Sequence, residues 1–255
     1  EGLHRTGRLS DDAMDRAIEA LHACADRLSR RPVRRFRAIA TEACRRAENG
    51  AEFLARARSE TGLDIATISS REEAELALES CASLLCHKNG RALLFDIGGG
   101  STEIAWVRLS GGHAEMIGYE SLPVGVVTLA ERWGNAAFTE RGFEAMVSDV
   151  EARLEPFDRV HRIADEIGNG GVTLLGTSGT VTTLAGIVLN LERYRRPAVD
   201  GVSLSADDAA DALDLLRDFL LPALAVRAAH GIVFAEQLAH VPAALRALAA
   251  GAGRK

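Results

Sequence analysis

The segment Asp96–Glu103, with the sequence DIGGGSTE, carries the clearest signal for chemistry and lies between two predicted strands. Three consecutive glycines allow the backbone to direct several N–H groups into one concavity, and such a nest binds phosphate oxygens. Asp96 and Glu103 flank the glycines with carboxylates, as required to hold a hydrated Mg²⁺ ion beside that phosphate. The segment therefore predicts a phosphate site with Mg²⁺ as cofactor and Asp96 and Glu103 as metal ligands. Its predicted phosphate-binding residues are Gly98, Gly99, Gly100, Ser101 and Thr102.

A plainer interpretation of this segment is a glycine-rich hairpin with a capping aspartate. It is not a Walker loop, because the G-x-x-x-x-G-K-[ST] pattern and the following helix are both absent from the sequence. Glycine-rich turns alone are common. The combination of glycines, hydroxyls and flanking acids within eight residues favours the phosphate site.

A second candidate is the segment Gly176–Thr180, with the sequence GTSGT, which precedes a predicted helix over 181–191. It brings hydroxyls together with the free amides of a helix N-terminus, which favours anions. An ordinary strand-to-helix turn with Thr180 as N-cap explains the pattern equally well. The presence of two such turns favours phosphate binding by Gly179 and Thr180, and we expect the two loops to face each other across a cleft that accepts a polyphosphate.

Charged residues upstream allow two interpretations each. Glu73 completes a capping box, Ser70-x-x-Glu73, which explains it without catalysis. Arg45 follows a predicted strand and could contact a transferring phosphoryl group or merely cover its helix. The arginine-rich stretch Arg27–Arg37 could follow a polyanion, although charge runs more often form a solvated face.

The elements that must position these residues follow from hydrophobic periodicity and turn signals. We predict two lobes, over residues 1–86 and 87–255, with the junction beside the turn-rich segment Cys86–Gly90. The predicted strands are 36–41, 63–68, 91–96, 103–109, 114–122 and 172–175. The predicted helices are 10–28, 42–47, 51–62, 69–85, 126–133, 140–154 and 181–191, and residues 205–248 are helix-rich.

The composition favours a folded globular protein over a nucleic-acid-binding or membrane-spanning one. Hydrophobic residues make up 47% and charged residues 26% of the 255, as in folded globular domains. The net charge of -6 gives no reason to expect nucleic-acid binding, and no apolar run is long enough for a membrane span. Four cysteines without a C-x-x-C pair suit reduced thiols in the cytoplasm, and seven scattered histidines argue against a histidine metal site.

Short blocks spread in order over residues 2–215 are similar to those of one known family. With Asp96–Glu103, they are Gly7–Ser10, Ala40–Arg45, Gly62–Ile65, Ile68–Ala74, Ser121–Gly125 and Gly179–Leu184. The chain resembles the exopolyphosphatase and guanosine pentaphosphate phosphatase (Ppx/GppA) family of the actin-like ATPase superfamily, and DIGGGSTE is the most specific block.

The resemblance implies an α/β fold of two ribonuclease-H-like lobes around a central cleft, with mixed sheets flanked by helices. It also implies Mg²⁺-dependent release of terminal phosphate from inorganic polyphosphate or guanosine pentaphosphate, and a homodimer. Glu73 matches the glutamate that activates the attacking water, Glu103 a second essential carboxylate, Asp96 a metal-shell acid and Arg45 a phosphate-contacting arginine. Gly98–Ser101 matches the phosphate cradle.

The chain departs from the family pattern in several places. It begins after the point where the family has an Asp-x-Gly-Ser-Asn-Ser phosphate loop, so we expect it to be part of a longer polypeptide. Ser70 and Glu75 replace a usual glycine and arginine beside Glu73, and residues 216–255 stay unassigned. These departures motivate an alternative, a catalytically weak sensor of polyphosphate or alarmone. A third alternative is an actin-like structural protein driven by nucleotide.

Overall fold

The computed structural model describes residues 3–85, 90–212 and 214. The chain divides into two compact units, the first made of Glu1–Arg132 and Phe157–Leu175, the second of Trp133–Pro156 and Gly176–Lys255. The lobe boundary predicted at residues 86 and 87 lies outside the described residues and stays a prediction. No helix of the described part is both long and apolar enough to cross a bilayer.

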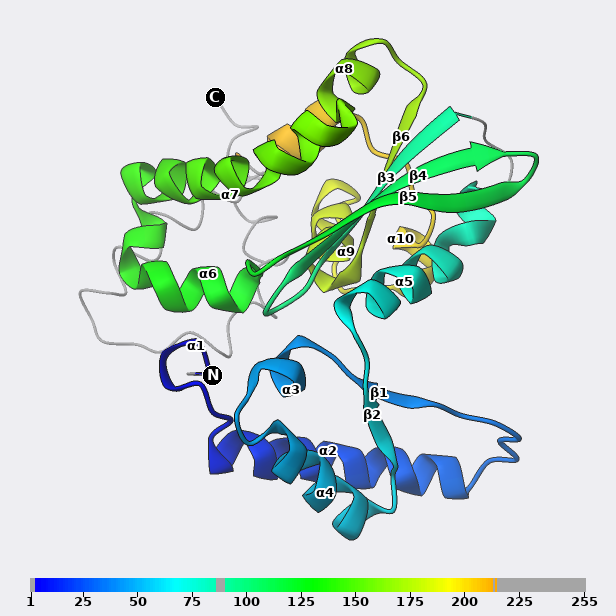
Figure 1. The fold of residues 1–255 in the computed structure, drawn as a ribbon, viewed down its shortest axis with the longest axis vertical. Helices are drawn as coiled ribbons and strands as arrows, with labels where there is room; N and C mark the ends of the chain where they lie inside the picture. The colour runs from blue at the N-terminus through cyan, green and yellow to red at the C-terminus, as the bar shows by residue number, and fades with distance from the viewer. Residues whose placement is uncertain (1–2, 86–89, 213, 215–255) are drawn as a thin grey trace. The chain divides into compact units, whose positions relative to one another are not determined.

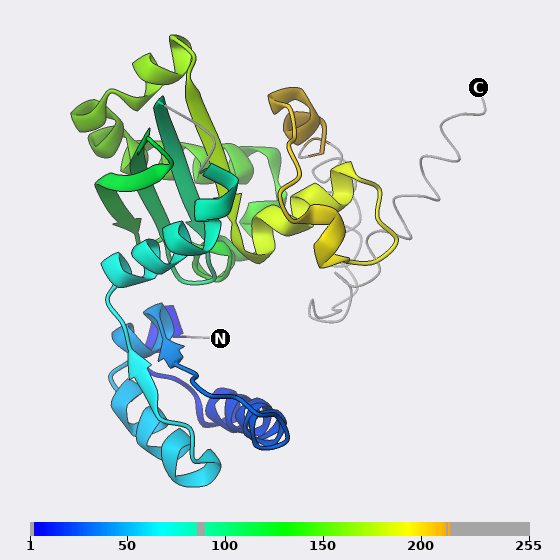
Figure 2. The same ribbon diagram turned by 90° about the vertical axis from the view of Figure 1, so that its right-hand side faces the viewer.

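The first unit begins with helices packed beside a two-stranded sheet (Figures 1 and 2). Ser10 caps the second helix as predicted, because its Oγ accepts a hydrogen bond from the Ala13 N–H at 3.3 Å. The core between α2 and α4 consists of Met14, Ile18, Phe53 and Ala57. The elements are α1 (Leu3–Thr6), α2 (Asp11–Ser29), β1 (Ala38–Ala40), α3 (Glu42–Arg46), α4 (Gly50–Thr61) and β2 (Ile65–Thr67).

Strands β1 and β2 run parallel, with Ala38 opposite Ile65. The strand predicted over residues 36–41 is therefore shorter than expected, since only Ala38–Ala40 pairs. Phe36 is 56% exposed and lies outside the pairing. Because parallel strands end at one edge of their sheet, the residues after β1 and those after β2 emerge together.

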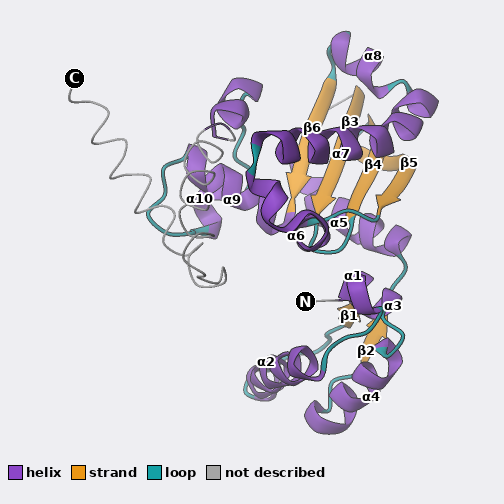
Figure 3. Ribbon diagram, turned by 90° about the vertical axis from the view of Figure 1, so that its left-hand side faces the viewer, coloured by secondary structure: helices purple, strands orange, loops and turns teal. Residues whose placement is uncertain are grey.

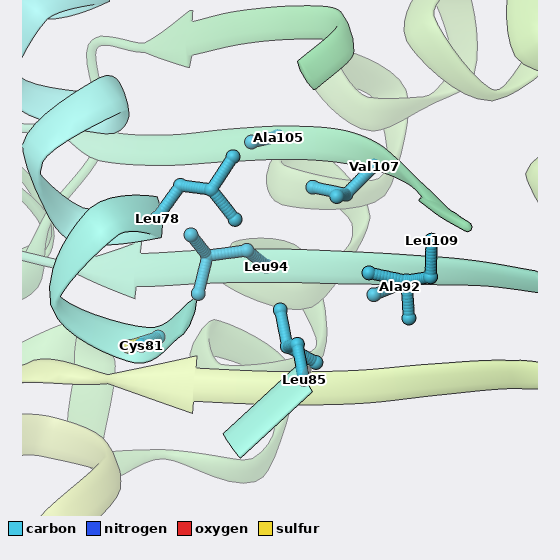
Figure 4. Close-up of a cluster of buried hydrophobic side chains, with 8 residues drawn as sticks. All are labelled: Leu78, Cys81, Leu85, Ala92, Leu94, Ala105, Val107 and Leu109. Carbon is cyan, nitrogen blue, oxygen red and sulfur yellow. The ribbon is translucent and has the colours of Figure 1, made fainter. Parts of the chain in front are cut away.

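A four-stranded sheet follows, in the order β5-β4-β3-β6 (Figure 3). Strands β3 (Gly90–Ile97), β4 (Thr102–Ser110) and β5 (His113–Leu122) form the predicted antiparallel meander. The backbone N–H of Arg91 lies 3.4 Å from the carbonyl of Gly171, so β3 and β6 (Val172–Thr177) start side by side and run parallel (Figure 4). The sheet is mixed, as predicted.

Helix α5 (Ser70–Leu85) packs on one face of this sheet. Its Leu78, Cys81 and Leu85 recur at helical spacing and point to β3 and β4 (Figure 4). The sheet contributes Ala92, Leu94, Ala105, Val107 and Leu109. Since side chains alternate along a strand, Asp96 and Glu103 belong to the same face as Leu94 and Ala105.

The remaining helices are α6 (Val126–Trp133), the 3₁₀ helix η1 (Gly134–Phe138), α7 (Glu140–His161), α8 (Ile163–Gly168), α9 (Ser178–Val188) and α10 (Arg196–Val199). Helix α7 continues seven residues beyond the predicted end at residue 154 and includes Pro156, where the boundary between the two units falls. Helix α9 begins at Ser178, so the predicted cap at Thr180 is wrong, and Thr177 occupies the N-cap position.

The core under α5 gives a direct test of this packing. We expect Leu94→Ala to lower the free energy of unfolding by about 2–5 kcal/mol, because Leu94 is 2% exposed and its removal leaves a cavity between helix and sheet. Leu174→Ala on β6 is the control, because Leu174 is 57% exposed and should change stability by less than about 0.5 kcal/mol. Urea unfolding measures both, and equal losses would contradict the assigned core.

Candidate active site

The sheet brings two acids together at the end of the β3–β4 hairpin. Asp96 and Glu103 are register partners, and Ser121 of β5 stands opposite Glu103 on the other side. Directly opposed side chains on one face have Cβ atoms about 5 Å apart. The two predicted metal ligands and a serine hydroxyl therefore form one row across three strands.

Glu103 is 4% exposed and accepts two hydrogen bonds. Ser101 Oγ donates to Oε1 at 2.7 Å, and Ser121 Oγ donates to the same oxygen at 3.0 Å. Burial raises the pKa of the Glu103 carboxyl, and the charges of Glu73 and Asp96 raise it further, while the two hydroxyls act in the opposite direction. Oε2 accepts no hydrogen bond from the described residues and is available to a cation.

Helix α5 delivers Glu73 to this acidic pair. Glu73 lies in the first turn, one turn before Ala77, which packs against the core under the helix. The stripe that buries α5 thus carries Glu73 towards Asp96 and Glu103, whose strands end there. The influence of the Glu73 charge on Glu103 reports this proximity.

The predicted capping box Ser70-x-x-Glu73 does not form among the described residues. The Ser69 hydroxyl accepts from the Glu72 N–H at 3.1 Å, so Ser69 caps the helix and Ser70 is its first residue. The Glu73 carboxylate binds Arg45 instead of returning to the helix backbone. The interpretation of Glu73 as a capping residue is therefore wrong, and its carboxylate contacts α3 through Arg45.

Arg45 lies on α3 and links this helix to the end of β2 and to the start of α5. Its Nη1 donates to Glu73 Oε2 at 2.9 Å and to the Ile68 carbonyl at 2.8 Å, and its Nη2 donates to Glu42 Oε2 at 3.0 Å. Burial alone would lower the pKa of Arg45, but the bonds to Glu73 and Glu42 outweigh it and raise the pKa. Three of the five guanidinium donors are used, so two stay available to an anion. Arg45 thus positions Glu73, and its predicted phosphate contact stays a prediction.

Glu42 was not predicted as a site residue, although it lies three residues before Arg45 on α3, at helical contact spacing. Its side chain lies against the glycine loop: a Cβ on Gly100 would stand 3.0 Å from Glu42 Cγ. Gly100 therefore permits α3 and the hairpin loop to approach closely.

The glycine loop is built differently from the predicted nest. None of the glycines 98–100 has a positive φ, so a left-handed backbone is not the reason for them. The carbonyls of Gly98 and Gly99 accept hydrogen bonds from the first N–H groups of α6, Val126 and Val127, at 3.0 and 2.9 Å. In the described chain, the N–H groups of Gly99, Gly100 and Ser101 donate to no protein atom. They remain suitable for phosphate oxygens.

Thr102 has a structural bond in this region, since its hydroxyl donates to the Val124 carbonyl at 2.8 Å. This contact ties the start of β4 to the segment before α6.

Glu75, the substitution that could change the charge beside Glu73, pairs with Arg71 at 2.9 Å, and both side chains are more than half exposed. Its charge is thus balanced on the solvent side of α5.

The second candidate loop, Gly176–Thr180, belongs to the second unit. Ser178 has φ 79°, an uncommon backbone for a non-glycine residue, and the buried Thr177 Oγ1 has no hydrogen-bond partner among the residues that the structure describes. Gly179 and Thr180 lie in the first turn of α9, an 11-residue helix. An unpartnered hydroxyl at a helix N-terminus supports the predicted anion site, and strained residues cluster at such positions.

Asp96 and Glu103 suit Mg²⁺ better than a metal ion whose ligands all come from the protein. Within residues 3–85, 90–212 and 214, no three Asp, Glu, His or Cys side chains lie close enough to enclose a metal ion. Mg²⁺ uses one or two carboxylates and completes its shell with water and phosphate oxygens. Asp96 and Glu103, opposed on one face with Glu103 Oε2 available, match that requirement.

Comparison with known proteins identifies the family. The model of the Ppx/GppA phosphatase family matches residues 1–200. The chain belongs to this family. It is 29% identical to the Aquifex aeolicus family member, with TM-score 0.65, covering 85% of this chain and 66% of that one. It is 30% identical to an exopolyphosphatase-like protein, with TM-score 0.73, covering 84% and 67%.

An exopolyphosphatase from Cytophaga hutchinsonii is 22% identical, with TM-score 0.61 and coverage of 85% and 66%, and supports the fold alone. The chain spans about two thirds of the length of these structures. The matches confirm the α/β fold class of the actin-like ATPase type that the sequence motifs indicated.

We expect Glu103→Gln to raise the free energy of unfolding by about 1 kcal/mol at pH 7.5 without metal, because the amide removes a buried charge beside Asp96 and Glu73. The folded-state pKa of Glu103 is raised, so the wild type loses stability as pH rises between the unfolded and folded pKa values. The advantage of the variant should therefore shrink at pH 4.5. Urea unfolding checks this, with the exposed Glu120→Gln as control; a destabilised Glu103→Gln would contradict it.

A second prediction concerns Gly125, where a Cβ would stand 2.5 Å from the Gly98 carbonyl oxygen and 2.6 Å from that of Gly99. We expect Gly125→Ala to push the glycine loop out of place and to lower the phosphate release that we propose for this protein roughly tenfold to a hundredfold. Gly168→Ala, which meets nothing within 4 Å, is the control. Phosphate-release assays with both variants measure the effect, and unchanged activity in Gly125→Ala would show that the loop tolerates displacement.

Proposed function

We propose that this protein is a phosphoanhydride hydrolase, releasing the terminal phosphate of inorganic polyphosphate, guanosine pentaphosphate or both. The observation that carries the proposal is the row of Asp96 and Glu103 beside a glycine loop with available N–H groups, with Glu73 held by Arg45. Family membership and an exopolyphosphatase-like relative at 30% identity support it.

In the proposed reaction, water attacks the terminal phosphorus, a new P–O bond forms and the bridging P–O bond breaks. The electron pair of that bond stays with the departing phosphate chain. Glu73 accepts a proton from the water, and Arg45 holds the carboxylate of Glu73 in one orientation. The N–H groups of Gly99, Gly100 and Ser101 bind oxygens of the transferring group, whose charge must be stabilised.

Asp96 and Glu103 would hold Mg²⁺, which when bound neutralises phosphate charge. Ser101 and Ser121 fix the Glu103 carboxylate through Oε1, so that Oε2 keeps one direction. The cytoplasmic location and the homodimer expected from the resemblance stay predictions.

Phosphate release from long-chain polyphosphate and from guanosine pentaphosphate, with and without Mg²⁺, tests the proposal. We expect metal-dependent release that Glu73→Gln reduces about 100-fold or more, since an amide accepts no proton from water. Glu75→Gln removes the same charge from an exposed position on the same helix and should retain activity. Absence of release from both substrates, with binding retained, would overturn the proposal in favour of the sensor.

A further inference from the structure

Residues 27–37, here called the arginine segment, concentrate positive charge in a chain whose net charge is -6. The eleven residues contain no acid, and their six arginines are Arg27, Arg30, Arg31, Arg34, Arg35 and Arg37. Such a run repels itself, so a bound polyanion would lower its free energy. None of the candidate site residues lies in this segment.

The structure leaves most of this charge unpaired. The segment leads from the last turn of α2 into β1 (Figure 1), and all six arginines are exposed. Arg30 forms a 3.4 Å pair with Asp26, and Arg37 a 2.6 Å pair with Glu72. Within the described part of the chain, the guanidinium groups of the other four make no ion pair. A solvated helix face balances its charges at i,i+4 spacing, and here that compensation is nearly absent.

The arginine segment is continuous with the candidate active site. Arg37 binds Glu72, the residue immediately before Glu73. The three residues of β1 span about 10 Å and lead from Arg37 to Thr41 and then to Glu42. An anionic chain whose end lies at Glu73 could therefore extend along β1 to the unpaired arginines.

We propose that the arginine segment is a distal subsite for long-chain inorganic polyphosphate, an inference that rests on the proposed function. Guanidinium groups bind phosphate oxygens through paired N–H donors, and each phosphate neutralised releases a counterion. Guanosine pentaphosphate or tripolyphosphate is too short to occupy both places. The subsite thus favours long chains through binding rather than through the chemical step.

Nucleic acid is the less suitable occupant. Single-stranded nucleic acids bind through rows of aromatic side chains on which successive bases stack. The arginine segment contains one aromatic residue, Phe36. Phosphates without bases need only the charge that the segment supplies.

The test combines Arg31→Gln, Arg34→Gln and Arg35→Gln in one variant. Its control removes the same charge from three exposed arginines on α2, β4 and α7: Arg16→Gln, Arg108→Gln and Arg141→Gln. Titration measures binding of long-chain polyphosphate, tripolyphosphate, guanosine pentaphosphate and single-stranded RNA to the intact proteins at several salt concentrations. Phosphate release from the first three gives KM and kcat separately.

We expect the Kd and KM for long-chain polyphosphate to rise about tenfold in the arginine-segment variant alone, with a shallower salt dependence and unchanged kcat. Values for the two short substrates should not change. Equal effects of both variants, or loss confined to RNA binding, would overturn the subsite while leaving the hydrolase intact. Chain-length-dependent binding without hydrolysis by the wild type would instead overturn the proposed function and retain the subsite.

Discussion

The site depends on the packing of α5 across β3 and β4. Leu78, Cys81 and Leu85 fix the helix on the sheet, and the same helical stripe ends in Glu73 at the strand ends that carry Asp96 and Glu103. The charges of Glu73 and Asp96 thereby act on the buried Glu103 carboxyl and raise its pKa. Hydrophobic burial offsets that repulsion, which makes the apolar core a condition for the acidic site.

Arg45 and the paired serines divide this acidic cluster between two environments. Arg45 donates a hydrogen bond to Glu73 and fixes its orientation, whereas Ser101 and Ser121 bind Glu103 without cancelling its charge. In the proposed reaction, the first carboxylate would accept a proton and the second would attract a cation. Glu73 and Glu103 are the same residue type, so any difference between them comes from their different hydrogen-bond partners.

The sequence predicted the elements and the family well, but not the contacts between residues. Alternation and apolar runs identified β3, β4, β5 and α5 near their observed bounds, because each is buried by a regular pattern. The role of Glu42, the partner of Arg45 and neighbour of Gly100, depends on contacts between residues far apart in the chain, which periodicity does not encode. Local reasoning likewise offered Thr180 as one possible cap for α9, whereas Thr177 holds that position, since GTSGT contains several hydroxyls.

The glycines of the loop serve a different structural purpose from the one that the sequence suggested. Three glycines suggested a backbone with unusual dihedral angles. Instead, the absence of a Cβ allows the Glu42 side chain to pack closely on Gly100 and the Val127 side chain to pack closely on Gly99. The carbonyls of the loop bind the start of α6, which turns the remaining N–H groups away from protein partners. A loop held by its carbonyls has its donors fixed before any anion arrives, so binding phosphate requires little ordering of the backbone.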